Sequence, residues 1–375
     1  MKKLFVIYHG RFPSEKAAAL FAAKEADSFV PFGAVTLLVP RNLGRVRSNP
    51  HAYYNISTDV RVVYLPALDL RYVPLVRHAA FLISYATFTL SCLAYFALQV
   101  RGRDIVITNE PLPALMATLF SDKVVVEVHD FPTHHHNFYA RLFRRAYTVL
   151  ATNKWKKGEL QKKFDIPEHK LLLERNAVDI EQFSSTDHAT ARAKLSLPQE
   201  VHIVVYTGHL YVWKGVDTLA EAAQRMPEVA VYFVGGTEYD LQKFKKKYAS
   251  ISNIHAVGQK PHGEMPLWQS AADVLVLPNS ARDQQSAQYT SPMKLFEYMA
   301  SGRPIVASNV PSIAEVLPVD AGYLVEPDSA AALAAAIQQV FAEPAEVAAK
   351  AARAQTLVRT HSWSERAKRL TARFA

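Results

Sequence analysis

The sequence predicts an α/β protein with two Rossmann-like domains, and three observations carry that prediction. Short β-branched runs alternate with helical stretches along all 375 residues, which is the pattern of parallel βαβ units. The runs are almost continuously apolar, as in strands buried on both faces. The alternation pauses at a polar connector, 176–199, and then restarts. Two such series predict two domains with parallel sheets, and a ligand cleft between them at the carboxyl ends of the strands.

The elements of the two series are expected at definite positions. The strands of the first series are expected at 4–8, 35–39, 61–65, 104–108, 123–128 and 147–151, and those of the second at 202–207, 229–234, 273–278 and 304–308. Helices of the second series are expected at 217–225, 239–247 and 292–300. The apolar run at the start of the chain is too short for a signal peptide, so we interpret it as the first buried strand.

The composition points to an anionic partner in a reducing compartment. Half of the residues are hydrophobic, a fifth are charged, and the formal net charge is +9. That charge fits nucleic acid, anionic lipid or phosphorylated small molecules, although each basic cluster can also be a solvated helix face. Cys92 is the only cysteine, which excludes an intramolecular disulfide and fits the cytoplasm.

The stretch Ala79–Val100 has no charged residue and is long enough to span a membrane. A spanning helix would place strands 4–8 and 104–108, which belong to one sheet, on opposite sides of a bilayer. We therefore expect a helix packed on the sheet, then a helix lying in the membrane interface, and only last a span. A mildly polar stripe supports this order, and it consists of Ser84, Thr87 and Ser91.

The two usual nucleotide motifs of Rossmann-like proteins are missing from the sequence. No GxGxxG follows a strand, and no GxxxxGK[ST] occurs. A dehydrogenase or a P-loop nucleotide hydrolase is therefore disfavoured, and nucleotide chemistry must be sought elsewhere in the chain.

A capped helix predicted in the second half of the chain could form a phosphate-binding site at its N-terminus. We expect Ser291 to cap this helix, Pro292 to take its first position and Gly302 to end it. The unpaired amides at its start, those of Met293 and Lys294, would then face an anion. An ordinary capped surface helix is the alternative.

Three further side chains could act on the same ligand. Glu297 lies about one and a half turns into that helix, where it could reach ribose hydroxyls. Gly208 follows a buried strand and permits close backbone approach, and His209 and Lys214 could neutralise a diphosphate leaving group. A solvent-exposed turn with a single lysine is the alternative for the segment 206–215.

A histidine also ends a strand of the first series. His129 follows Val128 and would point toward the cleft, although such a histidine is more often structural than catalytic. The adjacent histidines 134–136 have poor spacing for one metal ion, and no DxD motif is present, so we expect no metal.

These segments together resemble the family-4 retaining glycosyltransferases of the GT-B fold. The run Gly208-His209-Leu210 through Lys214-Gly215 resembles the diphosphate-binding turn of that family, often GRL…KG. Residues 176–183 resemble its NGVD..F signature, and 234–236 and 257–259 match its second-domain strand ends. Residues 291–304 resemble its nucleotide-binding helix. The resemblance covers nearly the whole chain.

The resemblance implies a role for each matching residue. Glu297 would bind the ribose, Lys214 would hold the diphosphate, and His209 would stand where the family usually has arginine. His129 would orient the donor sugar, and Gly10 would let the backbone approach the diphosphate and the acceptor. The remaining donor-binding residues would be Lys260 and Pro261 at the base, with Gly208, Tyr289, Thr290, Ser291, Met293 and Lys294.

Two positions depart from the family pattern. The family often has Glu-x7-Glu, but the position eight before Glu297 is Tyr289, which puts the sugar contact in doubt. Ala177 replaces the usual glycine of the junction signature. Neither departure touches the phosphate-binding residues.

The resemblance also implies domain roles and a function. An acceptor-binding domain would span 1–185, a nucleotide-sugar-binding domain 186–360, and a helix in 361–375 would return to the first domain. The activity would be retaining transfer of a sugar to a saccharide or lipid-linked saccharide in surface polysaccharide or glycolipid synthesis. No carboxylate is placed as a nucleophile, so we expect front-face displacement in which the departing diphosphate deprotonates the acceptor hydroxyl.

No cofactor is expected beyond the nucleotide-diphosphate sugar as co-substrate. The expected location is the cytoplasm, including the inner face of an anionic membrane, which the basic charge and the apolar helix both favour. A nucleotide-sugar epimerase of the same architecture and a non-catalytic nucleotide-sugar-binding relative stay open as alternatives. Nucleic acid is not expected, because the basic clusters lack interleaved aromatic residues.

Overall fold

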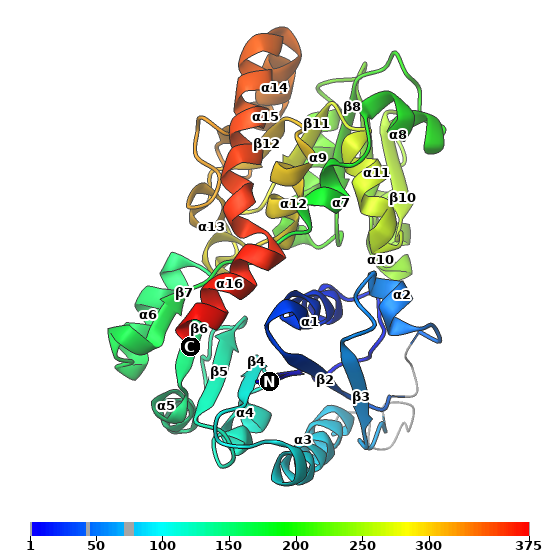
Figure 1. Ribbon diagram of the computed structural model, residues 1–375. Helices are drawn as coiled ribbons and strands as arrows, with labels where there is room; N and C mark the ends of the chain where they lie inside the picture. Colours follow the sequence, from blue (N-terminus) through cyan, green and yellow to red (C-terminus); the bar gives the residue numbers. More distant parts are fainter. Residues whose placement is uncertain (1, 43–45, 71–78, 375) are drawn as a thin grey trace. The chain divides into compact units, whose positions relative to one another are not determined.

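The computed structural model describes residues 2–42, 46–70 and 79–374, and it divides into two compact units (Figure 1). The first comprises Met1–Glu174 and Trp363–Ala375, and the second Arg175–Ser362. The connector 176–199 thus belongs to the second unit, because Val178 and Phe183 are buried in that unit's core. The division falls at 174 and not at the expected 185, and the last segment begins at Trp363 and not at 361.

In the described part of the first unit, seven parallel strands form one sheet in the order β3-β2-β1-β4-β5-β6-β7. The strands are β1 Lys3–Ile7, β2 Ala34–Pro40, β3 Arg61–Leu65, β4 Ile105–Thr108, β5 Lys123–Val128, β6 Thr148–Ala151 and β7 Leu171–Leu173. The helices are α1 Ala17–Ser28, α2 Pro50–Tyr54, α3 Ala80–Gln99, α4 Pro111–Ala117, α5 His136–Arg145, α6 Lys154–Phe164 and α16 Trp363–Arg373.

Helices cover both faces of this sheet, which explains why its strands are apolar throughout. One face packs on α3, α4 and α5 in a continuous core. The opposite face is covered by α1, and α16 lies beside α1 (Figure 1). The helix α16 therefore joins the first unit although it is the last element of the chain.

In the second unit, six parallel strands have the order β10-β9-β8-β11-β12-β13 among the described residues. The strands are β8 Ile203–Thr207, β9 Ala230–Val234, β10 Ile254–Gly258, β11 Val274–Leu277, β12 Ile305–Ser308 and β13 Tyr323–Val325. The helices are α7 Ile180–Ser184, α8 His188–Lys194, α9 Val216–Ala223, α10 Glu238–Lys247, α11 Met265–Ser270, α12 Met293–Ser301, α13 Pro311–Ala314, α14 Ala330–Ala342 and α15 Pro344–Val358.

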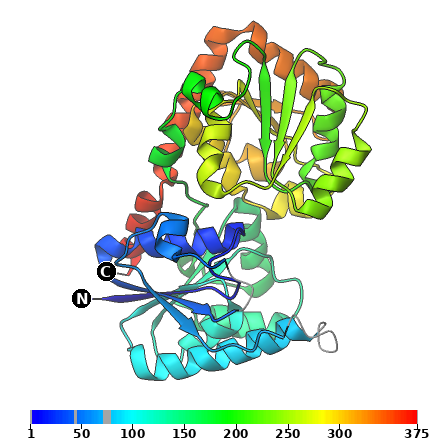
Figure 2. The ribbon, with the colours of Figure 1, turned by 90° about the vertical axis from the view of Figure 1, so that its right-hand side faces the viewer.

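The second sheet is also covered on both faces (Figure 2). Alternate residues of β8 enter different cores: Ile203 and Val205 pack with α11, α12 and α15, whereas Val204 and Tyr206 pack with α9 and α14. The predicted α/β fold with two parallel, Rossmann-like sheets is thereby confirmed.

The helix α3 packs on the first sheet along one side only. Phe88, Cys92 and Phe96 are buried in the core, as expected for a helix that covers a sheet. On the other side Leu82, Leu90 and Leu98 are 66%, 63% and 71% exposed. Among the described residues α3 is the one helix long and apolar enough to cross a membrane, although its buried side belongs to the sheet's core.

Candidate active site

The turn after β8 is built around Gly208, which has a positive φ of 129°. Its amide donates to the carbonyl of Val234 at 2.8 Å, which joins the ends of β8 and β9. A Cβ at this position would lie 3.1 Å from Lys294 Nζ. Glycine is therefore required both for the backbone angle and for the approach of the lysine.

Lys214 ends a short 3₁₀ turn, Val212–Lys214, that follows the Gly208 turn. Its Nζ lies 3.9 Å from the centre of the Trp213 ring. Burial lowers the pKa of Lys214 to about 8, because the charged ammonium loses solvent. Gly215 then turns the chain with a φ of 74°, where a Cβ would meet the Pro278 carbonyl oxygen at 1.7 Å.

Lys294 on α12 reaches the same turn from the other side. Its Nζ donates to the Thr207 carbonyl at 2.9 Å and lies 3.9 Å from the centre of the Tyr206 ring. Burial, followed by the charge of Lys214, lowers the pKa of Lys294 well below its usual value, and Glu297 partly offsets this. Burial and mutual repulsion both disfavour the charged forms of the two lysines. An anion bound between them would stabilise these charged forms.

The start of α12 differs by one residue from the expected cap. Pro292, and not Ser291, occupies the N-cap, and no side chain caps the helix. The reason is that Pro292 has an extended ψ of 114°, so helical geometry begins only at Met293. The amide of Leu295 donates to the Pro292 carbonyl at 3.0 Å, which is the first backbone hydrogen bond of the helix. The amides of Met293 and Lys294 come before it. Gly302 ends the helix in the left-handed conformation, as predicted.

Glu297 is 8% exposed and is held by two side chains that the sequence did not point to. His262 Nε2 lies 3.1 Å from Glu297 Oε1, and Gln269 Nε2 donates to Oε2 at 3.2 Å. The only local signal for His262 is its place directly after Lys260 and Pro261, at the end of β10. These contacts place the carboxylate near Lys294, where its charge offsets part of the lowering of the Lys294 pKa.

Other predicted residues of the second unit lie in the turn after β8 and in the segment before α12. His209 is exposed and stacks on Tyr211, with ring centres 4.9 Å apart and an interplanar angle of 8°. Tyr289 donates its hydroxyl to Gln284 Oε1 at 2.7 Å, and Thr290 donates to the Gln285 carbonyl at 3.0 Å. Both belong to the segment just before α12, which presents them beside the helix start.

The signature expected at the domain junction also reaches the helix start. Asn176 Nδ2 donates to the Ser291 carbonyl at 2.5 Å. This bond holds the residue before Pro292 in place. Lys214, Lys294 and Glu297 are thus brought together, and Gly208 and the start of α12 border them.

His129 and Gly10 belong to the first unit, at the carboxyl ends of β5 and β1. His129 Nε2 lies 3.3 Å from Glu127 Oε2, and the ring meets Phe21 edge-on with centres 4.7 Å apart. A Cβ at Gly10 would lie 2.2 Å from the Tyr8 hydroxyl oxygen, so this turn has no room for a side chain unless Tyr8 moves. Burial raises the pKa of Tyr8 to about 12.

The described residues hold no cluster of three or more His, Cys, Asp or Glu side chains that could bind a metal ion. Histidines 134–136 are exposed, and His136 stacks on Phe164 with ring centres 5.0 Å apart. The chemistry at hand is that of two half-buried lysines, helix amides and a carboxylate, a set suited to a phosphorylated ligand with neighbouring hydroxyls.

Comparison with known proteins finds glycosyltransferases among the similar sequences. Residues 201–343 match the family model described as glycosyl transferases group 1. The chain is 29% identical over 211 residues to D-inositol 3-phosphate glycosyltransferase 1 of Catenulispora acidiphila, covering 52% of this chain and 49% of that protein. It is 24% identical to the putative teichuronic acid biosynthesis glycosyltransferase TuaH of Bacillus subtilis, covering 60% and 55%. The chain therefore spans about half the length of these relatives.

Solved structures share the fold over the whole chain. Sucrose-phosphate synthase from Thermosynechococcus elongatus superposes with a TM-score of 0.80 at 21% identity, covering 99% of this chain and 98% of that one. HepE of Anabaena, in complex with UDP-glucose, superposes with a TM-score of 0.72 at 15% identity, covering 99% of each chain. The fold is that of the GT-B class. The predicted resemblance to GT-B glycosyltransferases is thereby confirmed for the fold, and residues 201–343 match a glycosyltransferase family model.

Proposed function

We propose that the protein is a retaining, metal-independent glycosyltransferase that takes a sugar from a nucleotide-diphosphate donor. The observation that carries the proposal is the meeting of Lys214, Lys294 and the uncapped start of α12 at the turn after β8, where burial lowers the pKa of both lysines. A diphosphate placed there would neutralise both cations. Glu297, held by His262 and Gln269, would accept hydrogen bonds from the ribose of the same ligand.

The catalytic effect in this proposal comes from charge stabilisation and positioning. Lys214, Lys294 and the helix amides stabilise the charge that develops on the departing diphosphate, with His209 beside them. The diphosphate oxygen takes the proton of the attacking acceptor hydroxyl while the sugar bond breaks, so the front-face displacement needs no protein base. Gly10 and His129 of the first unit would approach the acceptor and the donor sugar, and Lys260 and Pro261 the base.

The acceptor is proposed to be a saccharide or a lipid-linked saccharide of a surface polysaccharide or glycolipid. The relatives' names support this choice, since they include teichuronic acid and colanic acid biosynthesis glycosyltransferases. A structure of a relative in complex with UDP-glucose supports a nucleotide sugar as donor.

A donor screen tests the activity. Purified protein is incubated with UDP-, GDP-, ADP- and TDP-linked sugars, with and without membrane extract as acceptor. We expect release of one nucleoside diphosphate, strongly increased by the extract. Conversion of the donor into an epimer without any acceptor would replace the transferase by the epimerase. Binding of a donor without turnover in any mixture would replace it by a non-catalytic binding protein.

We further propose that the protein works in the cytoplasm and docks through the exposed side of α3 onto an anionic membrane. Leu82, Ala86, Leu90, Ala94 and Leu98 recur at every fourth position and form an exposed apolar stripe. Exposed arginines at 101 and 103 follow the helix, and the chain carries a net charge of +9. An apolar stripe bordered by positive charge matches the surface of an anionic bilayer.

Co-sedimentation with vesicles tests this docking. The protein is expected to sediment with vesicles containing phosphatidylglycerol, and Leu90→Glu is expected to remain in the supernatant. Val319→Glu is the matched control, because Val319 is 68% exposed but lies in the second unit. Failure of the unmodified protein to bind anionic vesicles would remove the membrane from the proposal.

A further inference from the structure

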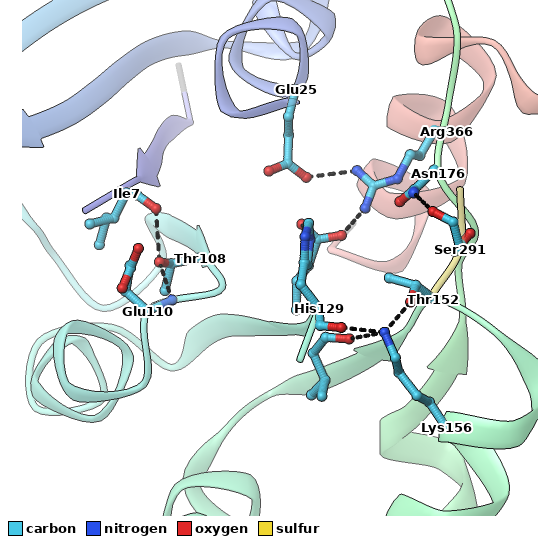
Figure 3. A network of polar contacts seen from close by, with 12 residues as sticks. Ile7, Glu25, Thr108, Glu110, His129, Thr152, Lys156, Asn176, Ser291 and Arg366 are labelled. Atoms are coloured by element: carbon cyan, nitrogen blue, oxygen red, sulfur yellow. Dashed lines mark hydrogen bonds and ion pairs between the residues drawn. The ribbon is translucent and has the colours of Figure 1, made fainter. Parts of the chain in front are cut away.

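A buried charge cluster lies behind His129 in the first unit (Figure 3). Arg366 of α16 reaches two carboxylates from different elements. Its Nη1 donates to Glu25 Oε1 at 2.7 Å, and its Nη2 donates to Glu127 Oε1. Arg366, Glu25 and Glu127 are 1%, 2% and 3% exposed, so water does not screen the charges. One cation therefore faces two carboxyl groups in a desolvated place.

The two carboxyl groups respond in opposite directions. Burial, and then the charge of Glu127, raise the pKa of Glu25, while Arg366 opposes the rise. Burial also opposes the ionisation of Glu127, but the charge of Arg366 and the hydrogen bond from His129 outweigh it and lower the pKa of Glu127. Glu25 is therefore the group that keeps its proton, and Glu127 is ionised beside Arg366.

The ionised carboxylate determines which nitrogen of His129 carries a proton. Glu127 uses Oε1 toward Arg366 and Oε2 toward His129 Nε2, at 3.3 Å. An ionised carboxylate only accepts hydrogen bonds, so His129 Nε2 must be the donor. In the neutral ring, Nδ1 is then the acceptor that stays available to a ligand. The side chain of His129 is 26% exposed, which allows such contact.

The backbone of His129 is anchored independently of its ring. Lys156 donates through Nζ to the carbonyls of Val128, at 3.3 Å, and of His129. The same Nζ donates to Thr152 Oγ1 at 2.7 Å (Figure 3). Changing Glu127 thus alters the ring's partner and leaves the anchoring of the strand end in place.

We propose that Arg366 and Glu127 are positioning residues that fix the orientation and the tautomer of His129. The last helix of the chain would thereby act on the donor-sugar contact through Glu127. Glu25 completes the charge balance and, among the described residues, forms its ion pair with Arg366 and not with His129, which makes it a natural control. The inference rests on the proposed function only for the part that His129 plays toward the sugar; the tautomer itself does not depend on it.

The substitutions Glu127→Gln and Glu25→Gln separate this role from a general structural one. Both replace a buried carboxyl that faces Arg366 by an amide of the same shape. At position 127 the amide oxygen must turn to the guanidinium, so the NH₂ faces His129 and can only donate. The ring is then expected to move its proton from Nε2 to Nδ1. At position 25 the amide mimics the neutral acid already present, and His129 is expected not to change.

The readout is the pair of ring ¹⁵N chemical shifts of His129 in histidine-labelled protein, assigned by comparison with His129→Gln. We expect the Nε2–H tautomer in the unmodified protein and in Glu25→Gln, and the Nδ1–H tautomer in Glu127→Gln. With the donor found by the screen, kcat of Glu127→Gln is expected to fall by about 10²-fold, the scale on which a misplaced positioning group acts, with KM for the donor little changed.

Several outcomes would overturn the inference. One is an Nδ1–H tautomer in the unmodified protein, a result that does not depend on whether Glu127→Gln folds. Another is an equal effect of Glu25→Gln and Glu127→Gln on the ring. A kcat of Glu127→Gln equal to that of the unmodified protein would contradict the role toward the sugar. Absence of turnover with every donor, together with the expected tautomers, would refute the proposed function and leave the positioning of His129 standing.

Discussion

The two regions around Lys214 and around Arg366 use buried charge in opposite ways. In the first unit, Arg366 is matched by Glu127, and Glu25 holds the remaining proton, so the cluster is complete without a ligand. In the second unit, neither Lys214 nor Lys294 forms an ion pair with a carboxylate among the described residues, and burial lowers both pKa values. A buried charge with a partner is compensated, whereas an unmatched one is costly until an anion binds beside it. The contrast is our reason for proposing that the ligand-binding charge lies in the second unit.

Removing one unmatched charge should have the largest effect. Lys214→Ala is expected to lower kcat by a factor on the order of 100 or more, because a donor aimed at the leaving-group charge is lost. The rate of nucleoside diphosphate release with the true donor is the measurement. Lys243→Ala removes an exposed lysine of α10 and serves as the control with an unchanged rate. Equal rates for Lys214→Ala and the unmodified protein would contradict the role of Lys214.

The same charge predicts a pH dependence on the alkaline side. Because burial lowers the pKa of Lys214 to about 8, the free protein carries the ammonium below that pH and loses it above. The value of kcat/KM for the donor should therefore fall above about pH 8, approaching tenfold per pH unit for a single ionisation. A profile of kcat/KM that stays flat to pH 9.5 would show that the neutral amine serves equally well.

Removing a side chain that positions Glu297 should have a smaller effect, mainly on the KM for the donor. His262→Ala is expected to raise KM for the donor by roughly tenfold, the scale of one hydrogen bond to a charged group, with kcat changed less. Glu264→Gln, in the same 3₁₀ turn, is the control. Loss of kcat with an unchanged KM would instead place His262 in the chemical step.

Fold class and most strands could be predicted because buried parallel strands leave a strong local signal. The strands β7 and β13 have three residues each and no long apolar run, so the sequence did not reveal them. The strand β10 carries the polar His255 and is only partly buried, which weakens its pattern.

The candidate site was predictable to the extent that each residue follows a strand or begins a helix. Gly208, Lys214 and the amides of Met293 and Lys294 have such local signals. The partners of those residues do not: His262 contacts a carboxylate 35 positions away, and Arg366 pairs with one 239 positions away. Such pairs form only when the chain folds, and no local sequence pattern predicts them. The cap at Ser291 was wrong because an extended Pro292 delays the helix by one residue.

The most direct test of the central claim is a crystal structure of the protein with the nucleoside diphosphate that the donor screen selects. The β-phosphate is expected within hydrogen-bond distance of Lys214 Nζ and of the amides of Met293 and Lys294, with the ribose hydroxyls on Glu297. A diphosphate bound away from Lys214 and the start of α12, or a ribose that does not touch Glu297, would contradict the account.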